Sequence, residues 1–214
     1  MIVISDMMGT LTTGSPVLGI VDWVGHNQSK NQARWLIARM MPGYLLVKIG
    51  LLDSQPWGQK LMIQSLDWVR DVTPQKFQQV ADWAVEHNLW PKRRTDVISM
   101  LSRHAQNGAQ VYIASSVVEP ITESFAHRFG AQAIGTPILI NNGRASLATD
   151  LIASDRKIQE VLTRLNLTCI DYAYGDTAMD IPLLEHAEHP IAFYPDKQLQ
   201  DYAKKRGWDI FGEN

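Results

Sequence analysis

The sequence predicts an α/β fold, in which a mostly parallel sheet carries helices on both faces and an α-helical cap is inserted after the first strand. Residues 2–5 form an apolar, β-branched run that opens the chain as a strand. Residues 17–88 have helical periodicity and contain no strand flanked by turn signals. From residue 91 onward helical and extended segments alternate, which is typical of a parallel sheet.

The first strand and the alternating region must share one sheet, because a lone strand has nothing against which to bury its apolar side chains. The helical segment between them is therefore an insertion. We predict a core made of residues 1–14 and 91–214 and a cap made of residues 15–90.

Composition and charge exclude several classes of protein. The 214 residues are 45% hydrophobic, enough for one sizeable domain or for a core with a smaller cap. The formal net charge of −2 gives no sign of a nucleic-acid or membrane partner. The most apolar window, residues 35–52, contains Arg39, Pro42–Gly43 and Lys48 and is too interrupted to span a bilayer. With no basic leader before the first strand we expect a cytoplasmic protein, whose oligomeric state the sequence leaves open.

Cysteine and histidine usage gives no metal-binding pattern. The single cysteine, Cys169, excludes an intrachain disulfide, and its apolar neighbours predict a small buried side chain. The six histidines form no matched ligand set. His186 and His189, three residues apart, are expected at a solvated helix end.

The predicted cap contains helices separated by turn signals. Pro42–Gly43 and residues 53–56 are predicted as breaks between helices. Thr73 is an expected N-cap, with Pro74 at the first helical position. The buried face of that helix is expected to be Phe77, Val80, Ala81 and Ala84. Six of the seven tryptophans fall in or beside the cap, where they either build a compact apolar core or line a ligand pocket.

The remainder of the chain alternates between helices and strands. Helices are predicted at residues 92–106, 120–129, 177–187 and 196–206, with a further helix capped by Ser154. Extended segments are predicted at residues 110–115, 133–134, 138–140, 169–174 and 190–193, with a turn at 141–143.

Three predicted strands end on side chains that can take part in catalysis or metal binding: Asp6, Ser115 and Asp176. Because the carboxyl ends of parallel strands open on one crevice, we expect these residues to lie together. The alternative for Asp6 is the common role of an aspartate that caps a turn. Two converging carboxylates repel each other, and Mg²⁺, which prefers oxygen ligands, relieves that repulsion. Asp180 lies one helical turn after Asp176 and is placed to support the cluster.

A hydroxyl and a lysine complete the set of groups that phosphoryl transfer needs. Ser115 offers a donor to an anionic oxygen, and Lys157 supplies a positive charge to the same group. Carboxylate nucleophile, divalent cation, hydroxyl and lysine are the parts of a phosphoryl-transfer site.

Four segments in order resemble the motifs of the haloacid dehalogenase (HAD) superfamily, specifically its phosphoserine-phosphatase-like branch with a helical cap. Residues 6–10, Asp-Met-Met-Gly-Thr, resemble the first motif, Asp-x-Asp-Gly-Thr. Residues 111–115 resemble the second, an apolar strand ending in Ser or Thr, and Lys157 fits the third, a helical lysine. Residues 175–180, Gly-Asp-Thr-Ala-Met-Asp, match the fourth, Gly-Asp-x-x-x-Asp. The predicted cap resembles the family only in position and helical character.

The resemblance implies a Rossmann-like core and an Mg²⁺-dependent phosphatase that acts on a small phosphorylated metabolite. Asp6 would attack phosphorus and carry the phosphoryl group as an aspartyl-phosphate. The implied metal ligands are Asp6, Asp176 and the backbone carbonyl of Met8. Ser115 and Lys157 would hold the phosphoryl oxygens. The implied phosphate-binding or supporting residues are Gly9, Thr10, Ser116 and Asp180.

Met8 is the departure from the family pattern that matters most. Most phosphatases of the family have a second aspartate here, which protonates the leaving oxygen and later deprotonates the attacking water. General acid–base catalysis of this kind contributes about 10²–10⁴-fold, and a thioether performs neither step. A backbone carbonyl is still present, so the implied metal site survives the change. Residues 116–118, Ser-Val-Val, also depart from the Gly-rich continuation expected of a phosphoserine phosphatase.

These departures leave three readings. The first is a phosphoric monoester hydrolase that acts slowly, or on leaving groups acidic enough to need no proton, such as acyl or aryl phosphates. The second is a catalytically weakened protein that binds a phosphorylated ligand or partner. The third is a dehalogenase-like reaction on a small acid, which Lys157 and the motif at residues 175–180 disfavour.

Overall fold

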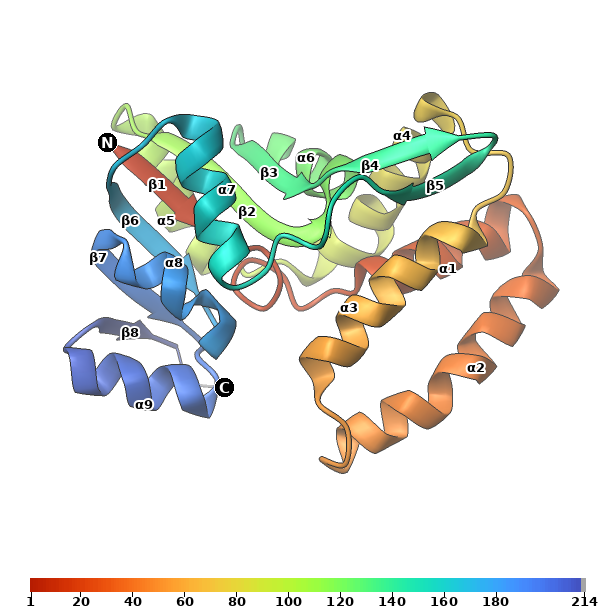
Figure 1. Cartoon of the computed structure of the whole chain (residues 1–214), viewed down its shortest axis with the longest axis horizontal. Helices are drawn as coiled ribbons and strands as arrows, with labels where there is room; N and C mark the ends of the chain where they lie inside the picture. The colour runs from red at the N-terminus through yellow and green to blue at the C-terminus, as the bar shows by residue number, and fades with distance from the viewer. Residues whose placement is uncertain (213–214) are drawn as a thin grey trace.

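The computed structural model describes residues 1–212, in which a six-stranded parallel sheet forms the centre of the fold (Figure 1). The strand order is β3-β2-β1-β6-β7-β8, so the first strand of the chain lies in the middle. Every pairing in this sheet is parallel, which confirms the predicted fold class. The strands are β1 (Ile2–Ser5), β2 (Gln110–Val118), β3 (Gln132–Thr136), β6 (Ile170–Gly175), β7 (Ala187–Phe193) and β8 (Asp209–Phe211).

Helices cover both faces of the sheet because successive strand residues point to opposite sides. In β1, Val3 belongs to one apolar cluster and Ile4 to the other. The cluster around Val3 takes in residues of α5 (Thr95–Gln106) and α6 (Glu119–His127). The cluster around Ile4 takes in residues of α7 (Asp155–Leu165), α8 (Ile181–Glu185) and α9 (Lys197–Arg206).

Between β1 and α5 the chain forms four α-helices: α1 (Pro16–Asn27), α2 (Lys30–Lys48), α3 (Ser54–Ser65) and α4 (Pro74–Ala84). Each begins at a side-chain N-cap that accepts a hydrogen bond from a first-turn amide, the caps being Ser15, Ser29, Asp53 and Thr73. Short helical turns follow at η1 (Leu66–Trp68), η2 (Val85–Leu89) and η3 (Trp90–Lys92). The division into a core and a separate cap at residues 15–90 stays a prediction.

The helical segment is joined to the sheet by its apolar residues. One cluster runs from Val3 of β1 through Ile20 of α1 and Phe77 of α4 to Phe125 of α6. Five of the six tryptophans in or beside the segment lie in or against this cluster: Trp23, Trp57, Trp68, Trp83 and Trp90. They therefore act as core residues, the first of the two roles expected for them. By contrast, α2 and α3 form an arm that extends away from the sheet (Figure 1).

A two-stranded hairpin, β4 (Ile138–Asn141) and β5 (Arg144–Leu147), lies outside the main sheet. Its two turn residues, Asn142 and Gly143, have φ of 50° and 74°. Positive φ at both central positions is what a tight hairpin turn requires, so the predicted turn is confirmed. The Gly143 carbonyl accepts a hydrogen bond from the Val72 amide at 2.8 Å, which ties the hairpin to the helical segment.

Two sequence predictions about the helices are wrong. Pro42–Gly43 does not end a helix, because α2 continues through both residues to Lys48. The tertiary contact overrides the local signal: a Cβ at position 43 would lie 2.4 Å from Nε1 of Trp57, so glycine lets α2 and α3 pack closely. Ser154 precedes α7 with φ of 49° and makes no side-chain cap.

Other differences concern strand ends and exposure. β2 continues beyond Ser115 to Val118, with a shift in its pairing to β3 after Ala114. Cys169 is exposed, because it lies in the loop before β6 begins at Ile170. His189 lies on β7, where it stacks on Tyr172, and not at a helix end. Across residues 1–212, the helices are too short or too polar for any of them to cross a bilayer.

Candidate active site

The strand register delivers three predicted site residues to one edge of the sheet. Ser5 of β1 pairs with Ile113 of β2 and with Tyr174 of β6. Asp6 comes one residue after Ser5, whereas Ser115 and Asp176 come two residues after the partners of Ser5. The three residues therefore lie at nearly the same height along the strands. The Asp6 amide donates to the Tyr174 carbonyl at 2.9 Å, which holds the end of β1 against β6. All three side chains leave at the carboxyl edge, as expected for a site in a parallel sheet.

Two glycines in the motifs are required by close approach. Gly9 has φ of +88°, and a Cβ there would lie 1.8 Å from Oδ2 of Asp176. A Cβ at Gly175 would lie 2.5 Å from the Cβ of Asp180. The glycine of the first motif thus makes room for the aspartate of the fourth, and the glycine of the fourth lets Asp180 fold back.

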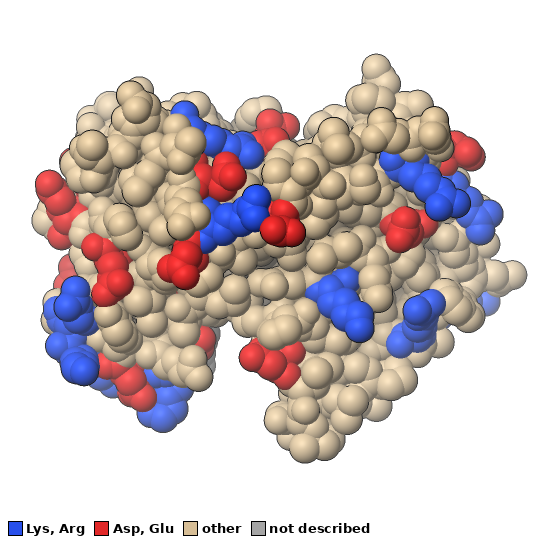
Figure 2. Space-filling view, viewed as in Figure 1, with Lys and Arg blue, Asp and Glu red and all other residues tan. Residues whose placement is uncertain are grey.

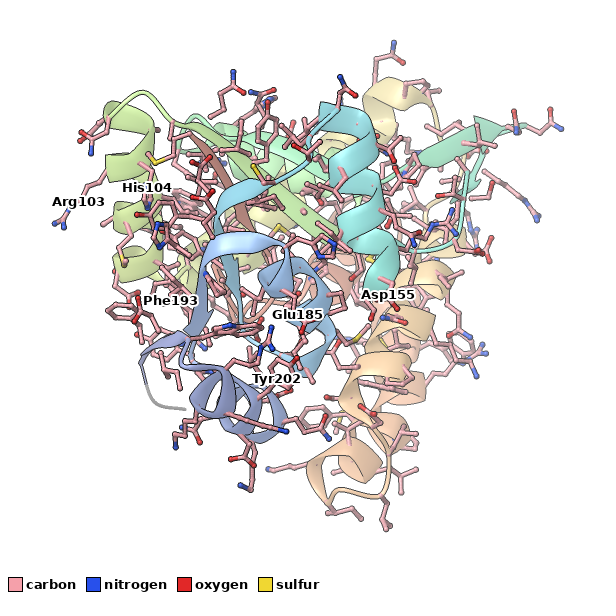
Figure 3. The ribbon with its side chains drawn as sticks, turned by 60° about the vertical axis from the view of Figure 1, so that its left-hand side comes forward. Arg103, His104, Asp155, Glu185, Phe193 and Tyr202 are labelled. Carbon is pink, nitrogen blue, oxygen red and sulfur yellow. The ribbon has the colours of Figure 1, made fainter. Side chains whose placement is uncertain are left out.

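Three buried carboxylates form the centre of the site. Asp6, Asp176 and Asp180 each offer one oxygen, and these oxygens lie within 4.8 Å of one another. Lys157 of α7 donates to Oδ1 of Asp6 and to Oδ1 of Asp180, both at 2.6 Å. Asp155 marks the start of this helix (Figure 3). One lysine therefore links the end of β1 to the turn after β6.

The remaining contacts show which carboxylate is supported by the protein and which is free to bind something else. Oδ2 of Asp180 accepts from the amides of Asp176 and Thr177, both at 3.2 Å. Thr10 donates to Oδ1 of Asp176 at 2.9 Å and lies 3.4 Å from Oδ2 of Asp6. Asp180 is thus fully engaged in holding the turn, whereas Asp6 and Asp176 retain acceptor capacity.

Burial and mutual repulsion shift the ionisation of the cluster. Burial raises the pKa of Asp6 to about 6, although the ion pair with Lys157 acts in the opposite direction. Burial, together with the charges of Asp6 and Asp180, raises the pKa of Asp176 to about 9. Burial lowers the pKa of Lys157, but its two carboxylate partners outweigh this and raise it overall. At neutral pH the cluster therefore holds a protonated lysine and a proton on Asp176.

The residues present fit a divalent cation. The cluster contains three carboxyl groups and one ammonium group, that of Lys157. Deprotonation of Asp176 therefore leaves a net negative charge in the cluster. One oxygen of Asp6 and one of Asp176 lie within 4.8 Å of each other, and carboxylate oxygens are the ligands that Mg²⁺ prefers. A hard cation would replace the proton of Asp176 and remove the repulsion.

A cleft of about 410 Å³ lies beside this cluster, a suitable size for a small ligand. Met8, Gly9 and Asp176 line it from the sheet edge, and Met62 of α3 lines it from the arm. A smaller space is lined by Asp6, Lys157, Met8 and Ser116. The space-filling view shows the notch between the two lobes of the molecule (Figure 2).

The predicted site residues other than Ser115 thus fall into two groups. Asp6, Thr10, Lys157, Asp176 and Asp180 are joined by contacts, and Met8, Gly9 and Ser116 line the adjoining spaces. Ser115 is buried, and its Oγ accepts from the Val117 amide at 3.3 Å. Its predicted role and those of the other residues stay predictions.

Sequence reasoning missed two residues of the arm. Gln55 and Gln59 of α3 line the space over Asp6 and Lys157. Their spacing of four residues puts both amides on one face of the helix. That spacing alone is a weak indication of a binding site. Whether α3 reaches the motifs depends on how the arm folds, which the sequence does not show.

A parallel α/β sheet with a buried acidic cluster at its carboxyl edge, and a lysine supplied by a flanking helix, defines a class of hydrolases. Residues 3–185 match the model of the haloacid dehalogenase-like hydrolases, and the chain belongs to that family. Within the family, its fold is that of the phosphoserine-phosphatase-like branch.

Individual relatives are distant. The chain is 25% identical over 142 residues to a histidinol-phosphatase of Neisseria meningitidis, a match that covers 61% of this chain and 62% of the relative. Matches to the other curated relatives cover 42–45% of their lengths.

Solved structures show the same fold at lower identity. A Bordetella pertussis protein of unknown function has a TM-score of 0.76 at 20% identity, covering 99% of this chain and 97% of that one. A phosphoserine phosphatase, solved as a phospho-aspartyl intermediate analogue, has a TM-score of 0.59 at 14% identity, covering 100% and 93%.

Proposed function

We propose that this protein is an Mg²⁺-dependent phosphatase that hydrolyses a small phosphorylated metabolite in the cytoplasm through an aspartyl-phosphate at Asp6. The observation that carries the proposal is the convergence of Asp6, Lys157 and Asp176 in one buried cluster beside a cleft. The family assignment and the similarity to a histidinol-phosphatase support it.

The proposed chemistry begins with a carboxylate oxygen of Asp6, which attacks phosphorus as the bond to the leaving oxygen breaks. The leaving oxygen departs with the bonding electron pair. Water then attacks the phosphorus of the aspartyl-phosphate, its proton passes to bulk solvent, and the P–O bond to Asp6 breaks to release phosphate and the free carboxylate. Lys157, 2.6 Å from Asp6, neutralises charge that develops on the phosphoryl oxygens.

Mg²⁺ would be held by Asp6, Asp176 and the backbone carbonyl of Met8. When bound it supplies positive charge next to the phosphoryl group and lowers the repulsion between an anionic substrate and the carboxylates. Asp180 has a positioning role in this proposal, because its two oxygens hold Lys157 and the turn that carries Asp176.

The helical segment is proposed to act as the cap that selects the substrate. Gln55, Gln59 and Met62 of α3 line the spaces beside Asp6. The two amides provide hydrogen-bonding groups for the part of the substrate that leaves, while the 410 Å³ cleft limits its size.

The direct test is phosphate release from a panel of alkyl, aryl and acyl phosphates, measured with Mg²⁺ and with a chelator. We expect Mg²⁺-dependent release from at least one class. A complete absence of release, combined with saturable binding of the same compounds, would favour the second function instead. That function is a phosphate-ligand binder with weakened catalysis, and the lack of a carboxylate at Met8 is the observation that favours it.

Mg²⁺ binding is expected to become tighter as the pH rises. Below pH 9 Asp176 is protonated in the metal-free protein, since burial and its neighbours raise its pKa to about 9. Binding must then release that proton, so the dissociation constant should fall by about tenfold per pH unit between pH 6.5 and 8.5. Calorimetry in two buffers of different ionisation enthalpy should show release of about one proton at pH 7.5. A dissociation constant that stays flat over this range would contradict the assignment, and Asp176→Asn is the matched control that should bind weakly at every pH.

A further inference from the structure

The second half of α2 and the loop that follows it are exposed and apolar. We define the arm tip as residues 37–52, a range in which no residue is buried. Ile49 is 66% exposed and Leu51 is 75% exposed. The other exposed large hydrophobic residues of the tip are Ile37, Met41, Tyr44, Leu45, Leu46 and Leu52. A concentration of this kind indicates a surface that binds something apolar.

The apolar exposure extends over several faces of α2, leaving out the side on which Gly43 packs against Trp57 of α3. Tyr44, Leu45 and Leu46 are consecutive and each is more than 40% exposed. Consecutive residues of an α-helix point about 100° apart, so these three cover more than half of the circumference. A protein groove receives one stripe of a helix. The interfacial layer of a bilayer has no fixed shape, so it accepts apolar side chains that project in several directions.

The charged residues in and around α2 are all basic. Between Asp22 and Asp53 the chain contains no aspartate or glutamate. The same stretch contains four exposed basic residues, Lys30, Arg34, Arg39 and Lys48. Two copies of this surface would bring like charges together, whereas anionic headgroups would complement them.

We propose that the arm tip docks on the surface of an anionic lipid bilayer, with its apolar side chains at the level of the headgroups and its lysine and arginine side chains on lipid phosphates. The proposal is independent of the phosphatase activity. It differs from the expectation of no membrane partner, which rested on the net charge of the whole chain; the local charge of the arm has the opposite sign. Insertion is shallow, because no helix of residues 1–212 is suited to crossing a bilayer.

Docking would also orient the cleft. The tip ends at Leu52, and Gln55 of α3, three residues later, lines the space over Asp6. In the space-filling view the lower end of this lobe is formed by uncharged atoms, next to the notch (Figure 2). A bilayer that contacts the tip would therefore lie close to the opening of the cleft.

Vesicle flotation with the full chain tests the proposal. Wild-type protein is expected to float with vesicles of phosphatidylcholine mixed with phosphatidylglycerol, and to be released by high salt. Replacing the tip residues together, Ile49→Ser, Leu51→Ser and Leu52→Ser, should weaken binding by at least about tenfold. Arg39→Gln with Lys48→Gln should weaken binding to the anionic vesicles by about fivefold per residue and leave binding to phosphatidylcholine alone unchanged.

Matched changes elsewhere provide the controls. Leu139→Ser alters a side chain that is 50% exposed on β4, and Lys204→Gln with Lys205→Gln alters exposed lysines of α9. These variants should bind like the wild type. Failure of the wild type to float, or equal binding by the tip and control variants, would overturn the proposal. So would light scattering that shows a wild-type dimer and a monomeric tip variant without vesicle binding, since that result assigns the tip to a second copy of the chain.

Discussion

Asp6→Asn is expected to abolish phosphate release, with a loss on the order of 10⁴-fold or more in kcat. The substitution removes the carboxylate nucleophile, because one of its oxygens is replaced by an amide nitrogen. The resulting amide side chain does not form an acyl-phosphate. The fold should survive, because Lys157 keeps its 2.6 Å ion pair with Asp180. The measurement is phosphate release on the best substrate of the panel, with the thermal unfolding midpoint recorded on the same samples.

Asp201→Asn is the matched control for this prediction. Asp201 lies on α9, where its carboxylate is exposed and pairs with Lys197 four residues away. Loss of an exposed pair of this kind has little effect on stability, and turnover should be unchanged. If Asp6→Asn keeps more than a trace of the wild-type rate, the phosphoryl group does not pass through Asp6.

Met8→Asp is expected to raise kcat on alkyl phosphates by about 10²–10³-fold, within the range that general acid–base catalysis provides. Alkoxide leaving groups need a proton, and an aspartate at this position would donate it. p-Nitrophenolate is stable without a proton, so the gain on p-nitrophenyl phosphate should stay below about tenfold. Met8 lines both spaces beside Asp6, so a side chain here faces the substrate region.

Met8→Asn separates proton transfer from polarity at this position. It has nearly the shape of the aspartate but donates no acidic proton, and it should give no gain on either substrate. Equal gains from Met8→Asp on alkyl and aryl phosphates, or none, would show that protonation of the leaving group does not limit the reaction.

Local patterns in the sequence were sufficient for the parallel sheet and for several helices. Thr73 and Pro74 open α4 as predicted, and its predicted inward residues are buried. The physical reason is that caps, turns and apolar periodicity depend on neighbours within a few residues. The two-residue turn at Asn142 and Gly143 was predictable for the same reason.

Tertiary contacts overrode the local patterns elsewhere. Pro42 lies inside α2, and the adjacent Gly43 packs against Trp57, a residue of the next helix. Cys169 is exposed although its neighbours are apolar, since burial depends on where β6 begins. Gln55 and Gln59 reach the space over Asp6 only because α3 folds back toward the sheet.

The amino-acid sequence alone was enough to identify the family, the order of its motifs and the unusual methionine at position 8, because these depend on residue identity and spacing. Which carboxylate supports and which is free, how Gly9 admits Asp176, and how the apolar residues of α2 come to face solvent all depended on the folded arrangement. The contacts of Gly9 and Thr10 with Asp176, and of Lys157 with Asp6, join segments more than a hundred residues apart. The exposure of α2 depends on which of its faces the other described elements cover, and spacing along the chain encodes neither.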